Sequence, residues 1–339
     1  MKKDKNLIIH IGVRKTATTT LQNGLFIQLH NKGLINYLGK LNLIDSNLKN
    51  EEKIKKNYQK ILDCLLYSHK ESRCPDYLIK SDVVNIFSDE ILSNIASNIK
   101  KTKKVIVDTS EFAKKLYTYF EVPASNVVIL VTIRNQQTFI PSNYAQIIKY
   151  NINNLKINTW KKYLNFFLNN KQIFSNFYFD KLLQSWVEVF GKDQIKILFY
   201  EDFLEDKIFF VKELSKIIGI SEDTIMFLLK GKHFNKKQKT DKGVIVNNVK
   251  IENPLKEFIR CIYKNPAFYT LFEPIKRQWP NNFLIRKFRD TPCKYGDIII
   301  DKPTKKDEKL IFEEFRSSNL NLWTEYGVDC KKLKKYGYI

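Results

Sequence analysis

The sequence predicts an α/β fold, in which a parallel β-sheet carries helices on both faces and a mostly helical C-terminal extension follows. Three observations predict it. Short apolar runs at 7–11 and 127–133 are typical of buried parallel strands, and residues 195–203 are expected to form a further strand. Segments with apolar residues at helical spacing separate these runs. The chain has 339 residues, 43% of them hydrophobic, which is enough to bury a large core.

In the first half of the chain, strand and helix patterns alternate. Leu21, Leu25 and Leu29 recur at helical spacing after the first strand. Ser110 is a suitable N-cap for a helix that Pro123 stops. The elements expected here are strands at 7–11, 83–87 and 104–108 and helices at 18–29, 45–72 and 111–120.

The second half continues the alternation. The strand at 127–133 ends at Arg134, and residues 135–141 are expected to form a loop into the next helix. Further helices are expected around Trp160 and Trp186, then a strand at 195–203 and a helix at 209–218 that closes at Gly219. We expect one α/β domain over residues 1–240 and a helical extension over 241–339 that packs on the same domain.

Composition limits the function classes. A formal net charge of +22 suits an anionic ligand, a nucleic acid or an acidic membrane surface, or reflects a solvated lysine surface. Five scattered cysteines without a C-x-x-C pair predict neither a disulfide framework nor a zinc site. The apolar run before Gly12 is too short for a signal peptide, and 127–133 is too short to cross a bilayer. A cytoplasmic protein is therefore expected.

The segment after the first strand has the composition of a phosphate-binding loop. Gly12 breaks the strand, and cations and hydroxyl residues lead into the helix, whose N-terminal N–H groups attract anions. Counted from Gly12, the nucleotide-triphosphatase pattern G-x-x-x-x-G-K-[ST] would place its lysine at Thr18, whereas this chain has Lys15. The candidate anion-binding residues are Arg14, Lys15, Thr16, Ala17, Thr18, Thr19 and Thr20.

A second candidate anion site follows the strand at 127–133. Arg134 stands at the strand end and Ser142 comes eight positions later, so that guanidinium and hydroxyl are candidates to bind one phosphate. Ligands of open parallel sheets bind beyond the carboxyl ends of the strands. Lys15 and Arg134 are both expected at that edge.

Both motifs resemble those of bacterial sulfotransferases that use 3′-phosphoadenosine-5′-phosphosulfate (PAPS), especially those acting on carbohydrates. H-I-G-x-x-K-T-x-T-T-x-L-Q, ending at Gln22, resembles the family's 5′-phosphosulfate loop, with Ala17 in place of the usual glycine. We expect a helical conformation at Ala17, which suits alanine. The second motif resembles the 3′-phosphate element R-[ND]-P-x-x-x-x-x-S-x-Y and departs from it at Gln136.

The similarity extends over much of the chain, and the fold that it implies is a P-loop-like sheet. Residues 195–203 resemble the family's Y-E strand, and residues 312–339 resemble its closing helix and G-Y tail. Asn235 lies where the family often has an asparagine near the 3′-phosphate.

The resemblance implies a sulfuryl transfer from PAPS to a hydroxyl of a carbohydrate, a cell-surface glycan or its precursor, with PAP as product and no metal. Lys15 is the candidate for the leaving 5′-phosphate, and the loop threonines and N–H groups would hold that phosphate. The general base is expected to be a glutamate. Glu90, in I-F-S-D-E-I-L-S, resembles the family's S-[DSN]-E-x-L segment, whereas Glu111 follows the expected strand at 104–108 and is also an ordinary first-turn helix residue.

Two other functions remain open at this point. A P-loop nucleotide kinase or ATPase is disfavoured by the early lysine and by the lack of a clear aspartate-ended strand for Mg²⁺. A nucleic-acid-binding protein would use the basic surface and bind in a strongly salt-dependent way. His10, inside the first strand, is expected to be a core residue.

Overall fold

The computed structural model describes residues 6–41, 51–67, 74–93, 109–151, 157–172, 174–230, 244–251 and 294–339. The chain divides into two compact units. The first comprises residues 1–140, 170–236 and 304–339, and the second comprises residues 141–169 and 237–303. The boundary expected at residue 240 stays a prediction beside this division.

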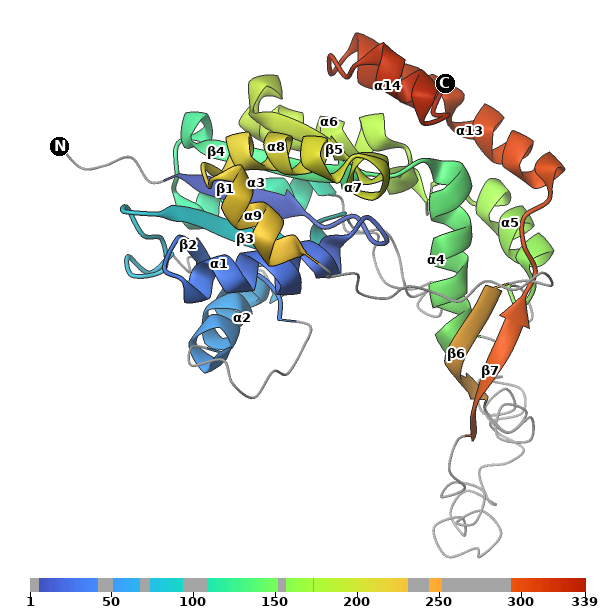
Figure 1. The fold of residues 1–339 in the computed structure, drawn as a ribbon, viewed down its shortest axis with the longest axis horizontal. Coiled ribbons are helices and arrows are strands. Elements are labelled where there is room, and N and C mark those ends of the chain that lie inside the picture. Colours follow the sequence, from blue (N-terminus) through green and yellow to red (C-terminus); the bar gives the residue numbers. More distant parts are fainter. Residues whose placement is uncertain are drawn as a thin grey trace, which may run out of the picture. The chain divides into compact units, whose positions relative to one another are not determined.

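The first unit is built on a parallel sheet (Figure 1). Within the described residues it has five strands in the order β2-β3-β1-β4-β5, and each neighbouring pair is parallel. Their bounds are β1 (Leu7–Ile11), β2 (Ile35–Tyr37), β3 (Val84–Asp89), β4 (Val127–Ile133) and β5 (Ile195–Phe199). The α/β fold with a parallel sheet that the sequence predicts is confirmed.

The strand register brings the carboxyl ends of the central strands to one edge. Ile11, the last residue of β1, lies opposite Asp89, the last residue of β3. On the other side of β1, Ile11 lies opposite Val131, and β4 continues from there to Ile133. The residues that follow these strands therefore meet at the same edge of the sheet, where an open parallel sheet binds its ligands.

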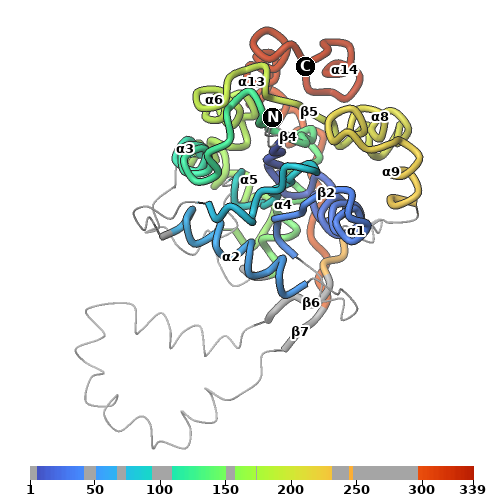
Figure 2. Tube along the Cα trace, turned by 90° about the vertical axis from the view of Figure 1, so that its left-hand side faces the viewer, coloured from blue at the N-terminus to red at the C-terminus, as the bar shows by residue number. Residues whose placement is uncertain are grey.

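Helices cover both faces of this sheet (Figure 2). On one face, Ile8, Leu130 and Leu198 belong to a buried apolar cluster with residues of the π-helix η1 (Thr20–Phe26), α1, α8 and α9. On the other face, Phe120 of α3 lies against Phe87 of β3, with ring centroids 6.0 Å apart. The helices of this unit that have not been bounded so far are α1 (Ile27–Asn31), α2 (Glu51–Tyr67), α3 (Thr109–Phe120), α6 (Phe179–Phe190), α7 (Tyr200–Glu205), α8 (Lys207–Ile218), α9 (Glu222–Leu229), α13 (Lys305–Thr324) and α14 (Cys330–Lys335).

The second unit contains most of α4 (Gln136–Asn151) together with α5 (Trp160–Asn169). It also contains the antiparallel pair β6 (Val244–Ile251) and β7 (Lys294–Ile300). The segment 241–339, for which a helical extension was expected, contains the helices α13 and α14 of the first unit. It also contains β6 and β7 of the second unit, and these strands were not predicted from the sequence.

The structure corrects the loop expected over residues 135–141, because α4 begins at Gln136 and Pro141 lies inside it. Asn135 makes this early start possible. Its side-chain Oδ1 accepts a hydrogen bond from the N–H of Gln137 (2.8 Å), and its carbonyl oxygen accepts from Phe139 (2.8 Å). An asparagine in this position satisfies N–H groups that have no partner within the helix.

Three smaller differences concern element ends. The helix expected over 18–29 has π-helical turns at Thr20–Phe26 before α1. Ser110, the expected N-cap, is the second residue of α3 and not its cap, because the helix begins at Thr109. The strand expected at 195–203 ends at Phe199, where α7 begins. The strand expected at 104–108 lies outside the described residues.

Candidate functional site

The loop after β1 has an unusual backbone. Lys15 and Ala17 both have positive φ angles, of 64° and 62°. The helical conformation expected at Ala17 is therefore wrong, because this residue occupies the left-handed region that glycine adopts without strain. Alternation of right- and left-handed residues turns successive N–H groups into a concave nest that binds anions. The positive φ angles at Lys15 and Ala17, on either side of Thr16, are the alternation expected of such a nest.

Gly12 and two threonines shape the base of this loop. A Cβ atom at Gly12 would lie 2.8 Å from Thr18 Cγ2 and 3.1 Å from the backbone N of Glu90, so only glycine fits. The hydroxyls of Thr16 and Thr18 both donate to the carbonyl oxygen of Val13, at 2.5 and 2.8 Å. These two hydroxyls hold the loop closed on itself, while Arg14, Lys15, Ala17 and Thr19 are partly exposed and Thr20 is buried.

Arg134 joins the two candidate anion elements. Its Nη1 donates to the carbonyl oxygen of Lys15 at 3.0 Å, across 119 residues of sequence. Its Nε donates to Thr138 Oγ1 at 3.0 Å, and its guanidinium lies 4.7 Å from the ring centroid of Tyr200. Burial lowers the pKa of Arg134, and the nearby Tyr200 and Glu201 side chains raise it. The result is a largely buried cation beside the loop that carries Lys15.

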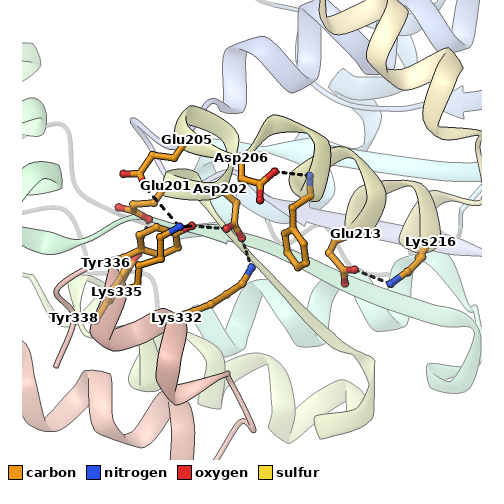
Figure 3. Close-up of polar contacts among 11 residues, drawn as sticks. Glu201, Asp202, Glu205, Asp206, Glu213, Lys216, Lys332, Lys335, Tyr336 and Tyr338 are labelled. Atoms are coloured by element: carbon orange, nitrogen blue, oxygen red, sulfur yellow. Dashed lines mark hydrogen bonds and ion pairs between the residues drawn. The ribbon is translucent and has the colours of Figure 1, made fainter.

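Glu201, the second residue of α7, holds the backbone next to Arg134. Its Oε1 accepts a hydrogen bond from the N–H of Asn135 at 2.9 Å, and its Oε2 accepts from the hydroxyl of Tyr338 at 3.1 Å. Burial raises the pKa of this carboxyl, and the hydrogen bond from Asn135 lowers it. Figure 3 shows Glu201 facing Tyr338 across the junction of α7 and the end of α14.

Of the two glutamates proposed as the base, Glu90 lies beside the loop. It is the first residue after β3, and its Oε2 is 4.0 Å from Arg14 Nε. The β3 end is joined to the loop, because the N–H of Gly12 donates to the carbonyl oxygen of Asp89 at 3.1 Å. Glu111 instead lies on an exposed part of α3, where its carboxylate pairs with Lys115 at 2.8 Å.

Two candidate ligands of the 3′-phosphate remain, Ser142 and Asn235. Ser142 is part of α4 and not of a loop, and its contact with a phosphate stays a prediction. Asn235 lies outside the described residues, so its assignment also stays a prediction.

Sequence reasoning missed Tyr200, Glu201 and Tyr338 as members of this site. Tyr200 and Glu201 directly follow β5, so the rule that singled out Lys15 and Arg134, a polar residue after a buried strand, would have found them. Tyr338 lies in the G-Y tail, and nothing in its local pattern indicates a partner in α7.

His10 is a buried core residue, as the sequence predicts. Its side chain is fully buried in β1, and its Nδ1 lies 2.7 Å from Ser88 Oγ. Burial lowers the pKa of His10 to about 3, which keeps the imidazole neutral.

The described residues contain neither a metal-binding cluster nor a membrane-spanning helix. No group of three or more His, Cys, Asp and Glu side chains in the described part of the chain is placed to hold a metal ion. Within the same residues, no helix has the length and apolar character that crossing a membrane requires.

Comparison with known proteins gives the family. A family model described as a sulfotransferase domain matches residues 5–260, and no curated protein matches. A crystal structure of a sulfotransferase from Alicyclobacillus acidocaldarius aligns with a TM-score of 0.37 and 12% identity, over 65% of this chain and 82% of that chain. Since the family model spans most of the sequence, the chain belongs to the sulfotransferase-domain family, whose members transfer a sulfuryl group to an acceptor.

Proposed function

We propose that this protein is a cytoplasmic sulfotransferase that moves the sulfuryl group of PAPS to a hydroxyl of a carbohydrate, a cell-surface glycan or its precursor. The observation that carries the proposal is the 3.0 Å hydrogen bond from Arg134 Nη1 to the Lys15 carbonyl oxygen. It joins two cationic elements at neighbouring strand ends. PAPS carries a phosphate at each end of its ribose, and each element would bind one of them.

The residues present fit such a ligand. The left-handed residues Lys15 and Ala17 give the loop the nest geometry that binds phosphate oxygens. Arg134 is a planar cation that is held by Thr138 and Lys15, and a bidentate fork matches the oxygens of a phosphate. Two anion sites on one edge of a sheet suit a bisphosphorylated nucleotide better than a single phosphate.

The roles of the loop residues follow from charge. PAPS supplies an activated sulfuryl group attached to the 5′-phosphate, on which negative charge grows as the group leaves. Lys15 is proposed to neutralise that charge, because a preorganised cation stabilises charge that develops in the transition state. Arg14, Thr16, Ala17, Thr18, Thr19, Thr20 and the loop N–H groups are proposed to orient the phosphosulfate end, and Arg134, Ser142 and Asn235 the 3′-phosphate.

A glutamate is proposed to accept the proton of the acceptor hydroxyl. Glu90 is favoured over Glu111 because it follows β3 and lies 4.0 Å from Arg14 of the loop. The pairing of Glu111 with Lys115 on the surface of α3 supports a role for Glu111 in stabilising the helix and not in catalysis.

A thermal-shift experiment tests the nucleotide. PAP is expected to raise the Tm of the protein without Mg²⁺, and more than adenosine 5′-monophosphate (AMP) does, because a ligand that binds only the folded state stabilises it. A larger shift with Mg²⁺ and ATP would favour a nucleotide kinase. Salt-dependent binding to DNA or RNA without any shift by PAP would favour a nucleic-acid-binding protein.

A second experiment tests the acceptor. Mass spectrometry of surface glycans from cells with the active protein, and from cells with the Lys15→Ala variant, is expected to differ by the mass of one sulfuryl group on a sugar. Glycans of unchanged mass, together with a sulfated lipid or small phenol, would replace the carbohydrate by that acceptor.

A further inference from the structure

Asn135, the residue after Arg134, is held by partners from three segments. Its N–H donates to Glu201 Oε1 (2.9 Å), its Nδ2 donates to the carbonyl oxygen of Tyr336 (2.7 Å), and its Oδ1 accepts from the N–H of Gln137 (2.8 Å). Asn135 is 5% exposed, so these bonds are shielded from water. They fix the backbone from which the Arg134 side chain leaves.

The segment Tyr336–Tyr338 supplies a second hold on the same point. The hydroxyl of Tyr338 donates to Glu201 Oε2 at 3.1 Å, while the other oxygen of that carboxylate holds Asn135. Tyr338 is fully buried, and burial raises its pKa, so the hydroxyl keeps the proton that it donates. Its carbonyl oxygen accepts from Asn319 Nδ2 of α13 at 3.0 Å.

Gly337, between the two tyrosines, allows this close approach. Its φ is 71°, and a Cβ atom there would lie 3.3 Å from Asn135 Nδ2. Tyr336 is anchored separately, because its hydroxyl donates to Asp202 Oδ1 at 2.6 Å (Figure 3). The segment therefore touches the Arg134–Asn135 corner through its backbone and, by way of Glu201, through a side chain.

We propose that the segment Tyr336–Tyr338 is a positioning element for Arg134, which fixes the guanidinium for the 3′-phosphate of the nucleotide without touching the ligand. The inference rests on the proposed function. A bound phosphate gains most from a cation that is already oriented, because no freedom of the side chain is then lost on binding. Release of the segment should weaken recognition of the 3′-phosphate specifically.

The ratio of the dissociation constants for AMP and PAP isolates this effect, because AMP lacks the 3′-phosphate. Tyr338→Phe removes one hydroxyl and changes no charge. We expect it to lower the preference for PAP about fivefold, which corresponds to the loss of one hydrogen bond. Tyr326→Phe is the matched control. The Tyr326 hydroxyl also donates a partly buried hydrogen bond, to the carbonyl oxygen of Asp180 at 3.0 Å, and this bond does not involve Arg134, Asn135 or Glu201.

A second pair of variants tests the backbone contact. Gly337→Ala places a methyl group against Asn135, whereas Gly327→Ala places one at a similar φ of 68° with no atom within 4 Å. Both substitutions are expected to lower the Tm through backbone strain. We expect Gly337→Ala to reduce the preference for PAP and Gly327→Ala to leave it unchanged.

Isothermal titration of the full chain with PAP and with AMP decides the outcome. A lower PAP preference in Tyr338→Phe and Gly337→Ala, with both controls like the wild type, supports the proposal. An unchanged ratio in these two variants overturns it and leaves the proposed function standing, whether both affinities stay the same or fall equally. If the wild-type protein itself shows no preference for PAP over AMP, the proposed function fails, and the positioning role fails with it.

Discussion

At the scale of single residues, Ala17 carries a conformation that alanine rarely adopts. Its φ of 62° costs about 1–2 kcal/mol relative to glycine. Ala17→Gly removes that strain and adds freedom to the unfolded chain, so we expect the free energy of unfolding to rise by about 0.5–1 kcal/mol. Urea denaturation measures the change.

Ala113 provides the comparison for this substitution. It is buried inside α3, where glycine costs about 1 kcal/mol through lost packing and added freedom of the unfolded chain. Ala113→Gly is therefore expected to lower the free energy of unfolding. A decrease for Ala17→Gly as well would contradict the strain at this position.

Lys15 is proposed to neutralise charge that grows on the leaving phosphate only in the transition state. Lys15→Ala is expected to reduce kcat about 100- to 1000-fold, the range for loss of one preorganised donor, with a smaller effect on the Kd of PAP. Steady-state kinetics and equilibrium binding separate the two quantities. Lys192→Ala, at an exposed position before β5, should match the wild type in both. Full turnover in Lys15→Ala would remove the leaving-group role.

Glu90 and Glu111 give a direct test of the base. Glu90→Gln keeps the shape of the side chain and removes its basicity, so kcat is expected to fall about 100- to 10,000-fold. Glu111→Gln should leave kcat near the wild-type value, because its carboxylate pairs with Lys115 on the surface of α3. Both variants are assayed with the same acceptor. The opposite ranking would transfer the role of base to Glu111.

At the scale of elements, α7 and α14 are joined by one buried and one exposed ion pair. Asp202 is 4% exposed and accepts from Lys332 Nζ at 2.7 Å and from the hydroxyl of Tyr336 at 2.6 Å. Asp202→Asn is expected to lower the free energy of unfolding by about 2 kcal/mol, because both hydrogen bonds lose their charged acceptor. Guanidinium denaturation measures this loss.

Glu205, on the same helix, is the control for Asp202. It pairs with Lys335 at 3.8 Å, and both side chains are 57% exposed. Glu205→Gln is expected to change stability by less than about 0.5 kcal/mol, since an exposed pair is screened by water and salt. Equal effects of the two substitutions would show that burial does not set the strength of the α7–α14 junction.

Elements with a strong period were predictable, and those set by side-chain caps were not. The run 127–133 is the strand β4 with the same bounds, because a buried parallel strand leaves a continuous apolar signal. The start of α4 at Gln136 depends on Asn135 as a cap, and Pro141 within the helix disguises it as a loop. The left-handed turn at Ala17 likewise depends on the loop that surrounds it and not on alanine's own preference.

At the scale of the whole molecule, His10 ties the stability of the sheet to pH. Its pKa is about 3 in the folded protein and near 6.5 in an unfolded chain, so below about pH 6.5 the unfolded state binds more protons. Its contribution is full above pH 6.5 and is lost as the pH falls. We expect this residue to remove about 1.4 kcal/mol of stability between pH 7.5 and 5.5.

The variant His10→Gln isolates this contribution. The free energy of unfolding, measured by urea denaturation from pH 7.5 to 5.5, should fall more steeply for the wild type than for the variant. Contributions common to both proteins, such as the lowered pKa of His30, cancel in the difference. Parallel pH profiles would show that His10 titrates normally in the folded protein.

The two halves of the candidate site differ in how far the sequence reveals them. Lys15, Glu90 and Arg134 follow buried strands, and a parallel sheet brings the carboxyl ends of its strands together. The partners of Asn135, the residue after Arg134, come from α7 and from Tyr336–Tyr338, and their pairing depends on tertiary packing between segments far apart in the chain. No local period or motif encodes such a pairing, which is why Tyr338 was not predicted.

The hydrogen bond between Asn135 and the Tyr336 carbonyl oxygen spans 201 residues. A chain emerging from the ribosome can form β1 and β4 early, but this contact has to wait until residues near 338 have been synthesised. Closing so long a connection is entropically costly and slow. The corner that holds Arg134 should therefore form later during biosynthesis than the sheet from which it projects.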